Sequence, residues 1–158
     1  MGRCRTSPVD PATGNTVCVG LPSVKTAASL FKKICYANKK YLSAGIIVGG
    51  WDPDLSGKVS DELIGTGNIF SINLGGTLVK QPFALGGSGS TYIYGWCDAN
   101  YKEGMSKEEC LEFVRHALAL AMARDGSSGG VIRTVVVDKN GSQRDMIPFD
   151  KLPKFWMG

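Results

Sequence analysis

Two glycine-rich turns stand on either side of an amphipathic helix pattern in this 158-residue sequence. The first, residues 86–95, reads Gly-Gly-Ser-Gly-Ser-Thr-Tyr-Ile-Tyr-Gly. The second, residues 124–133, reads Arg-Asp-Gly-Ser-Ser-Gly-Gly-Val-Ile-Arg. Both place small hydroxyl residues beside glycines at the edge of a predicted sheet. A backbone without Cβ atoms can approach a reacting group or a bound peptide closely, so both turns are candidate site segments.

The helix between the turns has a clear start and a clear end. Ser106 and Glu109 have the spacing of a capping box, with a hydroxyl at the cap and a carboxylate three residues later. The predicted helix ends near Asp125 and Gly126. Its period predicts an inward face made of Cys110, Phe113, Val114, Ala117, Leu118 and Ala121.

A second helix is predicted from about Ser23, capped by Ser23 or Thr26 and followed by Gly45. Its predicted apolar face consists of Ala27, Leu30, Phe31, Ile34 and Cys35. Residues 1–22 have prolines and glycines without an apolar period, which predicts an irregular or disordered arm before the domain at 23–158.

Short β-branched or apolar runs predict strands at residues 44–51, 69–72, 77–85 and 131–137. Asn140-Gly141 then turns the last of these into a hairpin with residues 144–149. The strands come in consecutive runs rather than alternating with helices. That order predicts an α+β fold, an antiparallel sheet with helices packed on it, rather than a doubly wound parallel sheet.

Composition narrows the function classes. Hydrophobic residues make up 43% and charged residues 20%, the formal charge is +4, and most basic residues are scattered, which favours a solvated surface over a nucleic-acid patch. No stretch reaches the about 18 apolar residues of a membrane span, and the first 20 residues lack a secretory apolar core. The five cysteines form no C-x-x-C pair and there is one histidine, so we expect reduced thiols, no metal and no cofactor.

Asp125 is the unusual polar residue in these turns. It is predicted at a helix C-terminus, where the macrodipole disfavours a carboxylate, so neighbouring hydroxyls, amides or a cation should compensate. Pairing with Arg124 alone remains an alternative. Gly-Ser-Ser-Gly-Gly around Ser128 matches the G-x-S-x-G motif of serine hydrolases. In those enzymes the serine follows a strand and the catalytic histidine comes after it, whereas Ser128 follows a helix and His116 precedes it, so a serine-hydrolase triad is excluded. The residues from Gly86 to Ser90 lack both phosphate-loop patterns.

Several stretches of the sequence resemble beta subunits of the proteasome core particle, of the caspase-like type that cleaves after acidic residues. The stretches are residues 26–33, 44–53, 81–95, 104–111, 117–133 and 153–155. The resemblance runs from about Leu21 to the end. Residues 60–68 look like an inserted loop, which costs little closure entropy if exposed.

The resemblance implies an αββα sandwich of the N-terminal-nucleophile hydrolase type, incomplete here at its N-terminus. In that family the first threonine of the processed chain attacks the peptide bond and its free α-amine acts as the base. It implies that Ser88 lies near that amine, and that Asp125 and Ser128 orient the threonine. The threonine itself has no counterpart in residues 1–20, so we expect this chain to be inactive alone.

The resemblance also implies partners and a location. Partners would be the other alpha and beta subunits and peptide substrates, with neither nucleic acid nor membrane. The location would be cytoplasm and nucleus, and the role ubiquitin-dependent and general protein degradation. A non-catalytic structural or assembly subunit of the ring remains the alternative.

Overall fold

The computed structural model describes residues 22–53 and 65–152. They form one element series: α1 (Val24–Ala37), β1 (Ile46–Pro53), β2 (Gly65–Ile72), β3 (Leu78–Lys80), α2 (Ser90–Asn100), α3 (Lys107–Arg124), β4 (Ile132–Asp138), β5 (Gly141–Ile147) and the 3-10 turn η1 (Phe149–Lys151). Within these residues no helix has both the length and the hydropathy that a membrane crossing needs. The predicted arm lies outside this range except for Pro22.

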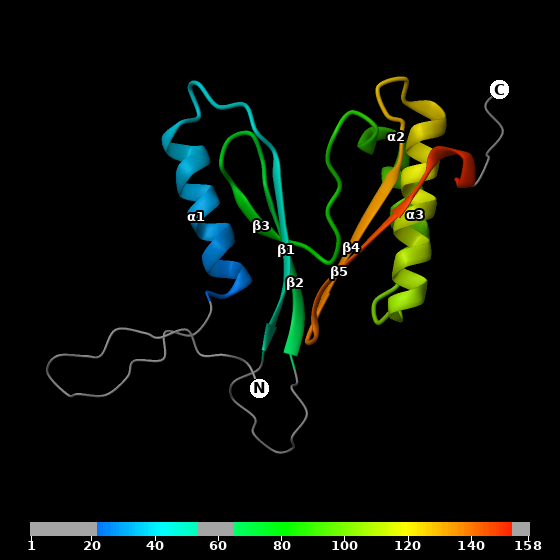
Figure 1. The fold of residues 1–158 in the computed structure, drawn as a ribbon. Helices are drawn as coiled ribbons and strands as arrows, with labels where there is room; N and C mark the ends of the chain where they lie inside the picture. The colour runs from blue at the N-terminus through cyan, green and yellow to red at the C-terminus, as the bar shows by residue number, and fades with distance from the viewer. Residues whose placement is uncertain (1–21, 54–64, 153–158) are drawn as a thin grey trace, which may run out of the picture.

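The strands form two antiparallel sheets in the described residues, one of β1-β2-β3 and one of β4-β5. Figure 1 shows α1 on one side of the first sheet, the β4-β5 hairpin on the other side, and α2 and α3 beyond the hairpin. The two sheets touch through β1 and β4. Helices packed on antiparallel strands are what the sequence pattern predicted.

Two apolar clusters hold the α2, α3 and hairpin layers together. One joins Ile93 and Cys97 of α2 to Ala117 and Ala121 of α3, and the small alanines let the two helices approach closely. The other lies on the opposite side of α3, where Ala119 packs with Ile132 and Leu152. Helix α3 is therefore buried on two sides, whereas the sequence analysis predicted one buried face.

The predicted inward face of α3 was partly wrong for this reason. Ala117 and Ala121 are buried, but Cys110 is exposed and Val114 and Leu118 are each 37% exposed. Val114 and Leu118 face a cavity rather than a packed layer. The capping box is confirmed, because Ser106 Oγ accepts from the Glu109 amide and Glu109 Oε2 accepts from the Ser106 amide.

The first helix is confirmed as α1, with Ser23 as its cap. Its predicted apolar face is only partly buried: Cys35 is buried, as is Ala28, whereas Leu30, Phe31 and Ile34 remain exposed. The apolar arc of α1 is wider than the strip that the sheet covers. The sequence pattern predicts which side of the helix is apolar, but it does not predict how much of that side the sheet covers.

Two strand predictions also need correction. Residues 77–85 form a strand only at Leu78–Lys80, because the chain leaves the sheet before Pro82, which has no N–H to donate. Residues 65–68 of the predicted inserted loop belong to β2, where Asn68 pairs with Gly50. A Cβ on Gly65 would collide with the Trp51 ring, so a glycine is needed there. Residues 60–64 and 153–158 fall outside the described range.

Candidate functional site

Ser88 lies in the loop that leads from the first sheet into α2. The loop turns at Gly87, whose φ of 90° is a conformation that favours glycine. Gly89 then caps α2 without a side chain. A Cβ at Gly89 would lie 2.8 Å from Ser128 Oγ and 3.2 Å from Asp125 Oδ2. The missing Cβ therefore lets this loop close onto the second glycine-rich turn.

Asp125 is the residue on which the two turns converge. Its Oδ2 accepts hydrogen bonds from Ser88 Oγ at 2.7 Å and from Ser128 Oγ at 2.5 Å. Its Oδ1 accepts from the backbone amide of Ser127 at 3.1 Å. Only 8% of Asp125 is exposed. Ser88, Asp125 and Ser128 thus lie together in the structure, and the roles that the resemblance implies for them stay a prediction.

These contacts supply the compensation that a carboxylate at a helix end requires. Asp125 caps the C-terminus of α3. The Ser128 hydroxyl, the Ser88 hydroxyl and the Ser127 amide lower the pKa of Asp125, and burial, the smallest of the four effects, opposes them. Neither of the two ion pairs found in the described residues involves Asp125, so hydroxyls and an amide, not Arg124, stabilise the charge.

The serine hydroxyls border a cavity of about 520 Å³. Ser88 and Ser128 belong to its wall, and Asp125 lies behind them. Much of the remaining wall is apolar. The loop before α2 contributes Phe83 and Leu85, and β1, α2 and α3 contribute Ile47, Ile93, Phe113, Ala117, Leu118 and Ala121. Because each hydroxyl proton is donated to Asp125, the serine oxygens retain lone pairs that can accept from an N–H donor.

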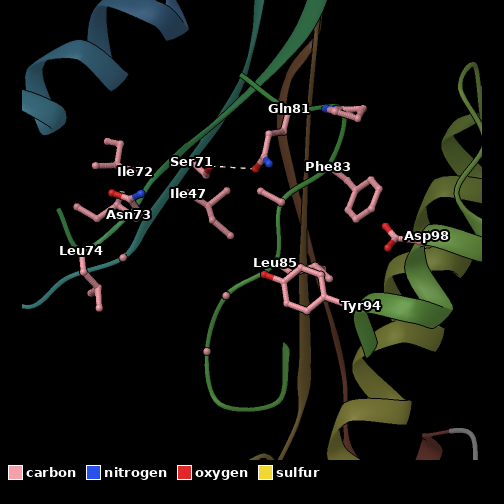
Figure 2. A pocket seen from close by; sticks show the side chains of 16 residues that line it. Ile47, Ser71, Ile72, Asn73, Leu74, Gln81, Phe83, Leu85, Tyr94 and Asp98 are labelled. Atoms are coloured by element: carbon pink, nitrogen blue, oxygen red, sulfur yellow. Dashed lines mark hydrogen bonds between the residues drawn. The ribbon is translucent and has the colours of Figure 1, made fainter. Parts of the chain in front are cut away.

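A second cavity, of about 930 Å³, lies between β1, β2, the 81–87 segment and α2. Ser71 Oγ donates to Gln81 Oε1 at 2.9 Å on one side of it. Figure 2 shows Tyr94 and Asp98 reaching it from α2, opposite Ile47. Its lining contains one carboxylate and no nucleophile beside a base. The cavity next to Ser88 and Ser128 is therefore the stronger candidate site.

The other sequence candidates lie elsewhere. His116 stacks on Trp96, with ring centroids 4.7 Å apart and planes within 3°, on the α2–α3 pair. Among the described residues no group of three or more His, Cys, Asp or Glu side chains could hold a metal ion. Cys35, Cys97 and Cys110 are free thiols.

Sequence reasoning missed α2. The glycine-rich sequence of residues 86–95 was interpreted as one turn, although a helix starts at Ser90. Ile93 and Cys97, four residues apart and both buried, were the signal that could have shown it.

Comparison with known proteins supports the family that the turns resemble. A family model for the proteasome subunit matches residues 18–137. Proteasome subunit beta type-6 of Dictyostelium discoideum is 60% identical over 137 residues, which are 87% of this chain and 59% of that protein. A probable proteasome subunit beta type-1 of Schizosaccharomyces pombe is 52% identical over 129 residues, 82% of this chain and 53% of that protein.

Proteasome subunit beta type-6 of Arabidopsis thaliana is 48% identical over 139 residues, 87% of this chain and 55% of that protein. The chain therefore spans little more than half the length of these relatives. The family match covers most of the chain, and it includes Ser88 and both glycine-rich turns. This chain belongs to the proteasome subunit family, and within it the chain is similar to beta subunits.

Proposed function

We propose that the chain is part of a beta subunit of the proteasome core particle and serves intracellular protein degradation in cytoplasm and nucleus. Its partners would be the other alpha and beta subunits, and its substrates peptides. The observation that carries the proposal is the convergence of Ser88 and Ser128 on Asp125 beside a cavity. The chain covers 59% of its Dictyostelium relative, so the activity is proposed for the longer protein.

In this proposal the three residues support a threonine nucleophile without reacting themselves. Asp125 holds both serine hydroxyls as donors, so their oxygens accept from the α-amine of the threonine. An amine oriented in this way can take the proton of the threonine hydroxyl as the oxygen attacks the substrate carbonyl. We propose the caspase-like type, which cleaves after acidic residues, because the sequence stretches at 81–95 and 117–133 resemble that type.

The open faces of the two sheets support an αββα sandwich that this chain builds only in part. Ile47 of β1 and Val135 and Val137 of β4 are large apolar residues that stay exposed in the described structure. Further elements of the longer protein, packed on these faces, would cover them. Because unpaired strand edges are templates for association, we expect the isolated chain to self-associate.

A labelling experiment tests the proposal. A mechanism-based, threonine-directed inhibitor should label the longer protein in assembled particles and leave the isolated 158-residue chain unlabelled. Co-purification of the longer protein with alpha and beta ring subunits, without labelling, would instead favour the non-catalytic assembly subunit. Labelling of the isolated chain would contradict the proposed support role.

A further inference from the structure

Residues 82–86 lead from the first sheet toward Ser88 without support from their own backbone. Within the described part of the chain, the backbone of this segment makes no hydrogen bond. The last backbone bond before it is donated by the Gln81 amide, and the first after it is accepted by the Gly87 carbonyl. The same residues line both cavities, so the segment borders open space on each of them. Side chains must therefore determine where the segment lies.

Phe83 anchors this segment to the two helices. Phe83 and Leu85 both pack against the apolar cluster of α2 and α3, and the Phe83 ring also contacts two other rings. Its centroid lies 5.0 Å from that of Tyr101, at the end of α2, and 6.4 Å from that of Phe113, on α3. The Tyr101 and Phe113 centroids are 6.2 Å apart, so all three separations are typical of aromatic pairs. Figure 2 shows the Phe83 ring pointing from the segment toward α2. We call Phe83, Tyr101 and Phe113 the three-ring cluster.

The three-ring cluster fixes one end of the stretch that carries Ser88, and the start of α2 fixes the other. Ser88 lies five residues after Phe83, and two glycines, residues 86–87, stand between them. Glycine restricts the backbone least, so this stretch can shift once its first end is released. Phe113 belongs to α3, and Asp125 caps the C-terminus of the same helix. The ring contacts therefore hold the stretch against the helix whose cap accepts the Ser88 hydroxyl.

We propose that Phe83 is a positioning residue, which holds the Ser88 hydroxyl in place for the threonine chemistry. Its ring keeps Ser88 Oγ within hydrogen-bond distance of Asp125, so that the serine oxygen stays directed at the α-amine. The inference rests on the proposed function and adds to it a residue that acts only through Ser88. About 1 Å of misplacement can slow a reaction about 100-fold, so loss of the ring should change the rate.

The rate of labelling by a threonine-directed inhibitor tests this proposal in the longer protein, assembled into particles. Phe83→Leu removes the ring but keeps an apolar side chain, and it should slow labelling about threefold to tenfold. Phe83→Tyr keeps the ring and should label within about twofold of the parent rate. The matched control is Phe70→Leu, since Phe70 is a buried ring of β2 that lines neither cavity. This variant should also label within about twofold of the parent rate.

Double variants test whether Phe83 acts through Ser88. Ser88 and Ser128 donate to the same oxygen of Asp125, but only Ser88 follows the segment that Phe83 anchors. In the Ser88→Ala background, Phe83→Leu should slow labelling by less than about 1.5-fold more. In the Ser128→Ala background, it should slow labelling by a further factor of about three to ten. The pH profile of Phe83→Leu should shift in the same direction as that of Ser88→Ala.

The outcomes separate this inference from the proposed function. Phe83→Leu at the parent rate, together with slow labelling of Ser88→Ala, would overturn the inference alone. Equal further slowing in both serine backgrounds would also overturn it, because Phe83 would then not act through Ser88. A Ser88→Ala variant at the parent rate would contradict the proposed function itself. If Phe83→Leu does not assemble, Tyr101→Leu removes the nearer partner ring and takes its place with the same expected rates.

Discussion

Ser88 Oγ donates a 2.7 Å hydrogen bond to Asp125 Oδ2, although 37 residues separate the two in the sequence. This bond joins the loop before α2 to the end of α3. Ser128 donates to the same oxygen from the other turn. One carboxylate thereby fixes both glycine-rich turns relative to each other and to the cavity that they border.

Removing the shared acceptor should cost more stability than removing either donor. Asp125→Asn takes away the charge that both hydroxyls and the Ser127 amide contact. Ser88→Ala and Ser128→Ala each remove only one donor and leave the carboxylate with two partners. Urea unfolding should rank Asp125→Asn as the least stable of the three variants. An Asp125→Asn variant as stable as the parent would show that the contacts contribute nothing.

The stabilisation by Asp125 should depend on pH in a defined direction. Its folded pKa is lowered from the ordinary value of 3.8, so the folded state favours the charged form. The contribution is present above pH 3.8 and is lost as pH falls from there through the lower folded pKa. The stability difference between the parent and Asp125→Asn should shrink as pH falls from about 6 to about 3.

The capping carboxylate of Glu109 also has a lowered pKa, chiefly through its bond to the Ser106 amide. Glu109 contributes equally to the stability of the parent and of Asp125→Asn, so its contribution cancels in the stability difference between them. A difference between the parent and Asp125→Asn that grows toward low pH would contradict the account of Asp125.

Two glycine substitutions in the same region should have opposite effects. An added Cβ at Gly89 would lie 2.8 Å from Ser128 Oγ and 3.1 Å from Ala121 Cβ, so Gly89→Ala should destabilise by about 1–3 kcal/mol. Gly95 lies inside α2 with nothing within 4 Å of such a Cβ. Gly95→Ala should stabilise by about 0.5–1 kcal/mol through helix propensity. Thermal unfolding measures both, and equal effects would refute the close approach at Gly89.

The two faces of β4 should respond differently to truncation. Ile132 is 1% exposed and packs under α3, so Ile132→Ala should cost about 2–4 kcal/mol. Val135 is 56% exposed on the other face, so Val135→Ala should cost less than about 0.5 kcal/mol. Urea unfolding of the pair tests which face is the core. Comparable costs would show that the open face is packed in solution.

Local signals were sufficient for several elements. Ser23 and Ser106 cap the helices that they were predicted to cap, because a hydroxyl before an apolar period is a local pattern. The predicted turn before β5 also forms, although its register pairs Asp138 with Gly141 and leaves Lys139 and Asn140 as the loop. Gly141 has a φ of 111°, which explains why glycine follows Asn140.

Contacts between residues that are far apart in the sequence could not be predicted from local patterns. The hydroxyls around Asp125 were among the predicted kinds of compensation, since a carboxylate at a helix end needs partners. That Ser88 is one of them was not predicted, because the two residues meet only through tertiary structure. The strand at Gly65 was missed for the same reason: the Trp51 ring that excludes any side chain there comes from another strand.

The rate of threonine acylation tests the central claim most directly. In the longer protein, assembled into particles, Ser88→Ala and Ser128→Ala should each slow labelling by a threonine-directed inhibitor and shift its pH profile, because the amine loses an acceptor. Ser142→Ala, an exposed residue of β5, is the matched control and should label at the parent rate. Parent rates and an unchanged pH profile in both Ser88→Ala and Ser128→Ala would contradict the support role of these serines.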